Sequence, residues 1–210
     1  MKKTLIPKLI FSYVLFVVLG FIILCTFTQH AITHYAENRE AQQLYRESVQ
    51  IASGYADNYN KYSFSLQDFQ KQMQSLGEYL SAQIWIMDNQ GNILFDSTDE
   101  SVGKNAANAN YKTLKGFNTS DFGNRYYMTG NFYGSFSEKN LTVFSPITSN
   151  YRIHSYVMIH KTVSSITQNA NGFMNIVFYT IEFVFLTALF LLLLFAHGFY
   201  RPLHLSLIHI

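Results

Sequence analysis

Two arginines and two tyrosines in the second half of the chain have side chains that could bind a small molecule. Arg125, Tyr127 and Tyr133 fall on one face of an expected strand, because alternate residues of a strand point to the same side. Arg152 lies in a later expected strand. A guanidinium beside aromatic rings suits a ligand that carries a carboxylate or an amine. The alternative is that these four side chains face solvent from the surface of a sheet.

The remaining chemistry-bearing residues do not form a catalytic or metal-binding set. His30 and His34 are about one helical turn apart, a spacing at which two imidazoles can share a metal ion. No cysteine and no acidic residue at a matching spacing completes a set of ligands, so we expect no metal site. The phosphate-binding patterns G-x-x-x-x-G-K-[ST] and G-x-G-x-x-G are absent from the sequence. We therefore expect no cofactor and no catalytic residue in this chain.

Composition narrows the class of protein. Of the 210 residues, 49% are hydrophobic and only 13% are charged, about half the charged share that is usual for soluble domains. This argues against a wholly soluble protein and against intrinsic disorder. The net charge is +2 and no basic block is present, so the sequence gives no support for nucleic-acid binding. The length allows one domain or at most two.

The first apolar run, residues 9–27, has no charged residue and is long enough to cross a bilayer. Lys2, Lys3 and Lys8 precede it and favour a cytoplasmic N-terminus. A cleaved signal peptide is the alternative, but the run exceeds the usual length of a signal core and no small-x-small cleavage pattern follows. We expect a retained transmembrane helix. Cys25, the single cysteine of the chain, lies within it and cannot form an intrachain disulfide.

A second apolar run covers residues 173–196, and Arg201 after it favours a cytoplasmic C-terminus. Glu182 is the only charged residue in either run. A carboxylate inside a membrane is costly, so Glu182 should be protonated, hydrogen-bonded or turned toward another helix. One alternative is a polar contact that shifts during signalling. The other is a single protonated glutamate tolerated in a very hydrophobic helix.

The segment between the two runs has the patterns of an α+β domain. Helices are expected over residues 31–62 and 65–80, and strands over residues 83–87, 92–96, 125–133, 141–146 and 151–160. Asp88-Asn89-Gln90-Gly91 is a turn cluster of the kind that joins hairpin strands. In the last strand, Ile153, Val157 and Ile159 are expected on one face and Arg152, His154 and His160 on the other. The order predicts an antiparallel five-stranded sheet with the N-terminal helices over one face.

Small and aromatic residues recur in the first of these helices at heptad-like spacing: Ala41, Tyr45, Ser48, Ala52, Tyr55, Tyr59 and Tyr62. The stripe is either a seam between two copies of the chain or the face that packs on the domain's own sheet. The second helix has one apolar face, formed by Leu66, Phe69, Met73, Leu76 and Leu80. That face should pack against the sheet.

Several short motifs, taken in order, resemble a known family. They are I-W-I-M-D-N-Q-G-N-I-L-F-D-S (residues 84–97), V-F-S-P-I (143–147), Y-V-M-I-H (156–160) and F-Y-R-P-L (199–203). With the two apolar runs, this arrangement resembles the sensor half of bacterial membrane histidine kinases. The domain between the runs is similar to a single Cache (PAS-like) sensor module. Residues 198–204 resemble the start of a HAMP linker.

The resemblance implies an organisation and a set of partners. The expected parts are a cytoplasmic N-terminus (1–8), a transmembrane helix (9–28), an extracytoplasmic sensor domain (29–172), a second transmembrane helix (173–197), a HAMP start (198–204) and a tail (205–210). The protein would be a multi-pass homodimer in the bacterial plasma membrane, with both termini cytoplasmic. Glu182 and Pro202 would take part in signalling, and a small molecule would be one kind of signal.

The kinase chemistry would lie in a domain beyond this sequence. No phosphoacceptor histidine in an H-E-x-x-x-P-like context occurs, so ATP, magnesium and a response regulator are expected only for that further domain. Residues 205–210, L-S-L-I-H-I, resemble the translation of a transposon-end sequencing adaptor, and we expect them not to be native. The alternatives are the sensor region of a chemotaxis or cyclase-linked receptor, and a membrane-anchored extracytoplasmic binding protein without catalytic output.

Overall fold

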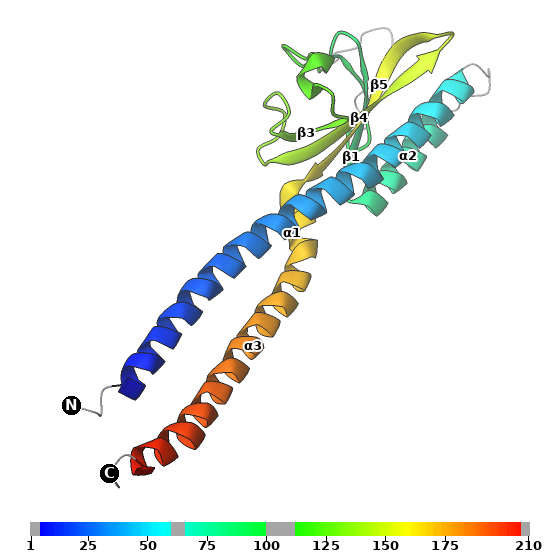
Figure 1. Cartoon of the computed structure of the whole chain (residues 1–210). Coiled ribbons are helices and arrows are strands. Elements are labelled where there is room, and N and C mark those ends of the chain that lie inside the picture. The colour runs from blue at the N-terminus through cyan, green and yellow to red at the C-terminus, as the bar shows by residue number, and fades with distance from the viewer. Residues whose placement is uncertain (1–4, 60–65, 100–111, 207–210) are drawn as a thin grey trace. The chain divides into compact units, whose positions relative to one another are not determined.

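The computed structural model describes residues 5–59, 66–99 and 112–206. The chain divides into two compact units (Figure 1). One consists of Met1–His34 with Ala170–Ile210, and the other is Tyr35–Asn169. The helices are α1 (Leu5–Tyr59), α2 (Leu66–Leu80), the short 3-10 helix η1 (Thr119–Phe122) and α3 (Val163–Ser206).

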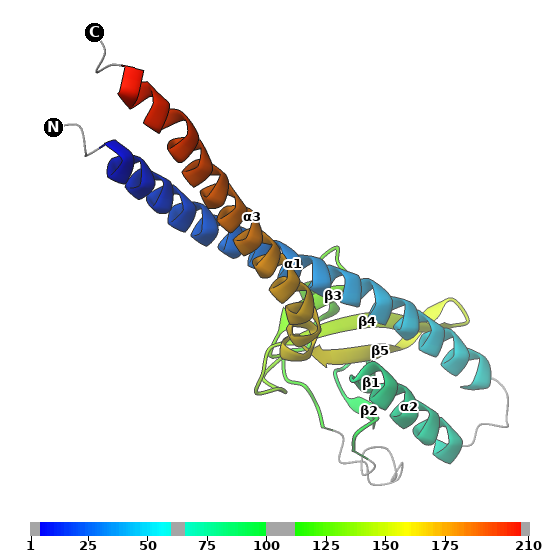
Figure 2. The same cartoon turned by 90° about the horizontal axis from the view of Figure 1, so that it is seen from below.

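The second unit is an α+β module with an antiparallel five-stranded sheet, as the sequence predicts (Figure 2). Its strands are β1 (Gln83–Asp88), β2 (Ile93–Asp96), β3 (Tyr127–Gly130), β4 (Asn140–Ser149) and β5 (Arg152–Thr162). Their order across the sheet is β2-β1-β5-β4-β3, and every neighbouring pair is antiparallel. The last strand in sequence therefore lies in the centre of the sheet.

The β1–β2 hairpin forms at the turn that the sequence indicates. The Asp88 carboxylate accepts hydrogen bonds from the backbone N–H groups of Gln90 and Asn92, at 2.8 and 2.9 Å. Gly91 has a φ of +85°, and a Cβ on it would come within 3.0 Å of the Leu114 carbonyl oxygen. Glycine is therefore required at this position, because a side chain would be both strained and crowded.

Two strands differ in length from the sequence expectation. The sequence predicts that the fourth strand ends at Pro146, but β4 continues to Ser149. β3 pairs with β4 only as far as Val143, so at Pro146 one edge of β4 carries no partner strand and the missing N–H costs no ladder bond. β3 itself ends at Gly130 rather than at residue 133. Phe132 and Tyr133 adopt positive φ values of 40° and 53°, which are incompatible with a strand.

Each face of the sheet is covered by a separate apolar cluster. On one face, residues of α1 and α2 such as Leu44, Phe69 and Met73 pack against strand residues such as Ile84 and Ile159. On the other face, the chain between β2 and β4 supplies Leu114, Phe122 and Phe132, which pack against Trp85, Met87, Ile93 and Met158. We call these the helix face and the loop face of the sheet.

The heptad-like stripe of α1 packs on the module's own sheet over the described residues. Ala41 and Ser48 are fully buried and Ala52 is 5% exposed, and both alanines belong to the apolar cluster of the helix face. The small side chains allow the helix to approach the strands closely. This supports the packing alternative for these positions. Tyr62, Ser65 and the side chain of Tyr59 lie outside the described part of the chain.

The first unit contains the two apolar helical segments. By length and composition, two helices of the structure can cross a membrane. Many of their large side chains face outward: Phe11, Phe16, Phe27, Phe173 and Phe183 are each 68–71% exposed. So much exposed apolar surface is unusual for a monomeric soluble protein and indicates a membrane or a partner around these segments.

The close packing of α1 on the sheet can be tested with two serines of the same helix. Ser48 and Ser53 each donate a hydrogen bond to the carbonyl three residues earlier, but Ser48 is fully buried and Ser53 is exposed. Ser48→Leu should lower the free energy of unfolding by about 1–3 kcal/mol through overpacking. Ser53→Leu should change it by less than about 0.5 kcal/mol.

The unfolding can be followed by the fluorescence of Trp85, the single tryptophan, which is buried on the loop face. Equal effects of the two substitutions would contradict the packing of α1 on the sheet.

Candidate functional site

The four predicted ligand-binding residues do not form one site. Tyr127 lies on the helix face, and its hydroxyl donates a 2.6 Å hydrogen bond to Asn38 Oδ1 of α1. Tyr133 lies on the loop face, where its hydroxyl hydrogen-bonds the Asp121 carboxylate. Arg125 precedes β3 and Arg152 begins β5, and both are exposed. The predicted common strand face is wrong because β3 ends before the positive-φ turn at Tyr133.

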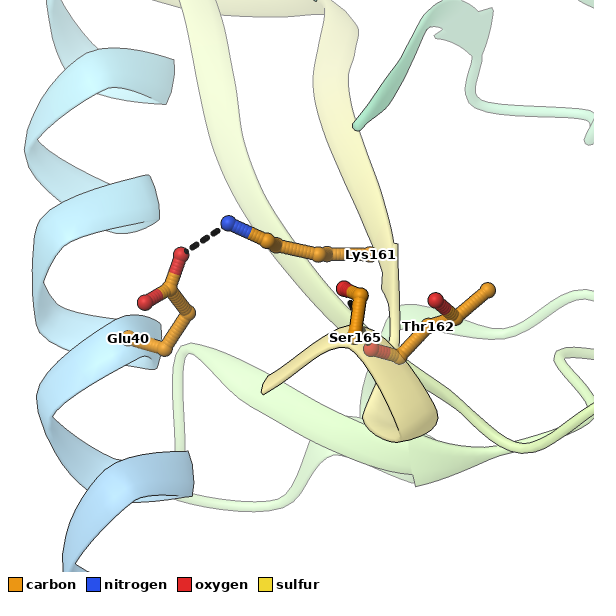
Figure 3. A network of polar contacts seen from close by, with 4 residues as sticks. All are labelled: Glu40, Lys161, Thr162 and Ser165. Carbon is orange, nitrogen blue, oxygen red and sulfur yellow. Dashed lines mark hydrogen bonds and ion pairs between the residues drawn. The ribbon is translucent and has the colours of Figure 1, made fainter. Parts of the chain in front are cut away.

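The structure instead joins α1 to the end of β5 through an ion pair that the sequence did not indicate. Lys161 reaches from β5 toward α1 and its Nζ donates to Glu40 Oε1 at 2.5 Å (Figure 3). The two side chains are only 10% and 22% exposed. A lysine on an otherwise apolar strand face needs such a partner, because a buried unpaired charge is costly. That requirement is the one sequence signal that could have pointed to the pair.

β5 passes into α3 directly after this ion pair. The strand ends at Thr162 and the helix begins at Val163, with no residue between them. The Ser165 hydroxyl donates to the Thr162 carbonyl at 3.0 Å, which satisfies an acceptor at the start of the helix (Figure 3). The Val163 N–H donates to the Lys139 carbonyl at 2.9 Å. The first residues of α3 are thus bonded to the sheet, and we call residues 160–165 with Glu40 the strand–helix junction.

His160 is the neighbour of Lys161 and points to the opposite face of the sheet. It is 2% exposed and is surrounded by aromatic rings, with centroid distances of 4.3 Å to Trp85, 4.8 Å to Phe132 and 4.9 Å to Phe136. Its Nδ1 lies 2.9 Å from the Thr142 hydroxyl oxygen, on the neighbouring strand. Burial lowers the pKa of His160 to about 3. The imidazole is therefore neutral at physiological pH.

Two polar atoms of this aromatic cluster are buried without a partner. Among the described residues, neither His160 Nε2 nor Trp85 Nε1 has a hydrogen-bonding group within reach. The Lys112 ammonium lies 5.7 Å from the centre of the Trp85 ring, so a cation faces the cluster from its outer side. Such unsatisfied groups are uncommon in folded proteins.

Adjacent residues of β5 thus connect the two faces of the sheet at the strand–helix junction. His160 packs within the aromatic cluster of the loop face, while Lys161 pairs with Glu40 of α1 on the helix face. A displacement of β5 that alters the packing on one face would also alter the packing on the other, because consecutive strand residues share one backbone. The strand–helix junction therefore couples the packing of the two faces of the sheet through one backbone.

The two predicted signalling residues lie in the first unit. Glu182 borders a cavity of about 180 Å³ together with Tyr13 and Phe185. The Tyr13 hydroxyl donates a 2.9 Å hydrogen bond to the Phe185 carbonyl, which links the two apolar segments one turn from Glu182. The backbone at Pro202 is helical, since α3 continues to Ser206 without a break at residues 198–204. The side chain of Pro202 lies outside the described part of the chain.

Comparisons with known proteins add no assignment. No family model matches the chain, and no curated protein sequence matches it.

Burial of neutral His160 makes stability depend on pH. The folded-state pKa of about 3 lies below the ordinary value of 6.5, so between these pH values the unfolded chain binds the extra proton. The His160 contribution is fully present above pH 6.5 and is lost as the pH falls toward 3. Well below pH 6.5 the loss approaches roughly 1–1.5 kcal/mol per pH unit.

Denaturant unfolding between pH 4 and 7 tests this expectation. His160→Gln should lower the slope of the unfolding free energy against pH by roughly 1–1.5 kcal/mol per pH unit at the acidic end of this range, whatever its effect on stability at pH 7. His154→Gln is the matched control, because it makes the same replacement at an exposed position of the same strand. The same slope for His160→Gln and the parent chain would show that the imidazole is not held neutral.

Proposed function

We propose that this chain is the signal-sensing input half of a bacterial membrane two-component sensor histidine kinase. The observation that supports this most strongly is the continuity of the module with both apolar helices. α1 is one helix from Leu5 to Tyr59, and α3 follows β5 without an intervening residue. A structural change in the sheet therefore has a direct covalent path into each apolar segment.

The proposed location is the bacterial plasma membrane. The two apolar segments cross it, both termini are cytoplasmic, and the α+β module lies on the outer side as a Cache-like sensor domain. The exposed phenylalanines of these segments support a lipid environment, in which their burial is favourable. Lys8 before the first segment and Arg201 after the second support the orientation.

The proposed mechanism is a shift between two packings of the module. A signal that binds one packing better than the other moves the equilibrium by the difference in its two affinities. The strand–helix junction converts that shift into a displacement of α3, with Glu182 and Pro202 on the path. A HAMP linker and a kinase domain in a homodimer then receive it. ATP, magnesium and a response regulator act at that kinase domain.

Cysteine labelling in spheroplasts tests the topology. In a Cys25→Ser background, Tyr79→Cys places a thiol on an exposed position of α2, and Lys8→Cys places one before the first apolar segment. A membrane-impermeant maleimide should label Tyr79→Cys in intact spheroplasts and Lys8→Cys only after lysis. Protection of Tyr79→Cys until lysis would exclude an extracytoplasmic module.

A fusion kinase tests the signalling role. Residues 1–197 are joined to the HAMP, dimerisation and catalytic domains of a characterised histidine kinase, and autophosphorylation is measured in membrane vesicles. Lys161→Met removes the ion pair at the junction and should change the output about fivefold, because about 1 kcal/mol shifts a two-state equilibrium by that factor.

Lys71→Met, at an exposed position of α2, is the matched control and should leave the output unchanged. If Lys161→Met also leaves it unchanged at equal amounts of fusion in the membrane, the module does not act on the kinase through this junction.

A further inference from the structure

A cavity of about 300 Å³ lies on the helix face, at the opposite end of β5 from the strand–helix junction. Three parts of the module form its wall. Tyr55 and Ala56 come from α1, Leu94 comes from β2, and the rest comes from the β4–β5 hairpin, residues 147–155. This volume is at the lower end of the range for small-molecule sites, so the cavity suits one small ligand rather than a polymer.

The lining residues define the chemistry of the ligand. Ala56, Leu94 and Ile147 give an apolar floor, and around it are hydroxyl, amide and imidazole groups from Tyr55, Ser149, Asn150, His154 and Ser155. Among the residues that the structure describes, the lining includes no aspartate, glutamate, lysine or arginine. A charged ligand would lose its hydration without gaining a countercharge, which is unfavourable. The cavity therefore favours an uncharged molecule with several hydrogen-bonding groups and an apolar surface.

The tip of the hairpin carries an aromatic side chain that the fold does not use. Ser149 pairs with Arg152, so Asn150 and Tyr151 form a two-residue turn, with φ values of 50° and 59°. Asparagine and glycine are favoured in such a turn, and a bulky tyrosine is strained there. Tyr151 is fully exposed, with a relative accessibility of 104%, so packing does not offset that strain. Its ring is free to contact something outside the fold.

We infer that this cavity, together with Tyr151 at the tip of the hairpin that lines it, binds a neutral sugar or polyol of monosaccharide to disaccharide size. One face of a sugar ring carries C–H groups that pack on an aromatic ring, while its hydroxyls hydrogen-bond to serine, asparagine and histidine. Ser155 of the cavity and Lys161 of the junction are on the same strand. This inference rests on the proposed function only for the role of the sugar as a signal. The binding itself does not depend on whether the chain controls a kinase.

Ligand-observed NMR on the full chain tests this inference. The chain is placed in phosphatidylcholine nanodiscs, because maltoside and glucoside detergents would compete for a sugar site. Glucose, maltose and myo-inositol are the neutral probes, and glucuronate and glucosamine are their charged counterparts. At least one neutral probe should bind, about tenfold or more tightly than either charged sugar. Absence of binding by all three neutral probes, or equal binding of the charged sugars, would overturn the inference.

Tyr151→Gly separates the ligand role of the tyrosine from a structural one. Glycine relieves the positive-φ strain, so the unfolding temperature should rise by a few degrees while affinity for the neutral probe falls about tenfold. Ser149→Phe fills the cavity and should abolish binding. Thr148→Phe adds the same bulk to a neighbouring exposed position that does not line the cavity, and should bind normally.

Unchanged affinity in both Tyr151→Gly and Ser149→Phe would place any sugar binding elsewhere and reject this site. These outcomes are independent of the fusion kinase, whose output is measured without a sugar. If the chain binds no sugar but Lys161→Met still changes the output of the fusion kinase, the sugar inference is wrong and the proposed function stands. If the chain binds a sugar but Lys161→Met does not change the kinase output, the binding site stands and the proposed function is wrong.

Discussion

β5 is hydrogen-bonded to β1 on one side and to β4 on the other, and it ends where α3 begins. A strand held on both sides cannot slide without breaking two ladders, so its end is a fixed point of the module. The first residues of α3 are further bonded to Lys139 and Thr162. The start of an apolar helix is thus determined by the sheet, and the proposed signalling function depends on this constraint.

The junction contains two side chains whose burial requires compensation. Lys161 is compensated by Glu40, whereas His160 is compensated only in part, by Thr142 and by the loss of its charge. Polar groups of this kind add little to stability compared with apolar residues of the same size. They do make the packing specific, because any other position of β5 would leave a lysine charge or an imidazole without its partner. A module that must exchange between two defined packings benefits from such specificity.

Local features of the fold could be predicted from the sequence. The β1–β2 hairpin depends on Asp88 and Gly91, which are neighbours in the chain, and the alternation of β5 correctly separates Val157 and Ile159 from His160. The class of fold follows from the order of such local patterns.

The site could not be predicted in the same way. Glu40 and Lys161 are 121 residues apart and meet only because α1 covers the sheet. Tyr133 leaves the expected strand because Phe132 and Tyr133 adopt positive φ. Gly130, Asn131 and Gly134 flank this turn, and they are the sequence signal that the strand ends before it. The cavity on the helix face combines residues of three separate segments, so its residues share no spacing.

The most direct measurement of the central claim uses a flexible insertion at the junction. Four glycines placed between Thr162 and Val163 in the fusion kinase remove the continuity of β5 with α3 but leave the sheet and the ion pair in place. The outputs of Lys161→Met and its parent should then become equal, so that their ratio is about one, while Trp85 fluorescence shows unchanged stability of the module. A ratio that the insertion leaves unaltered would contradict transmission through the strand–helix junction.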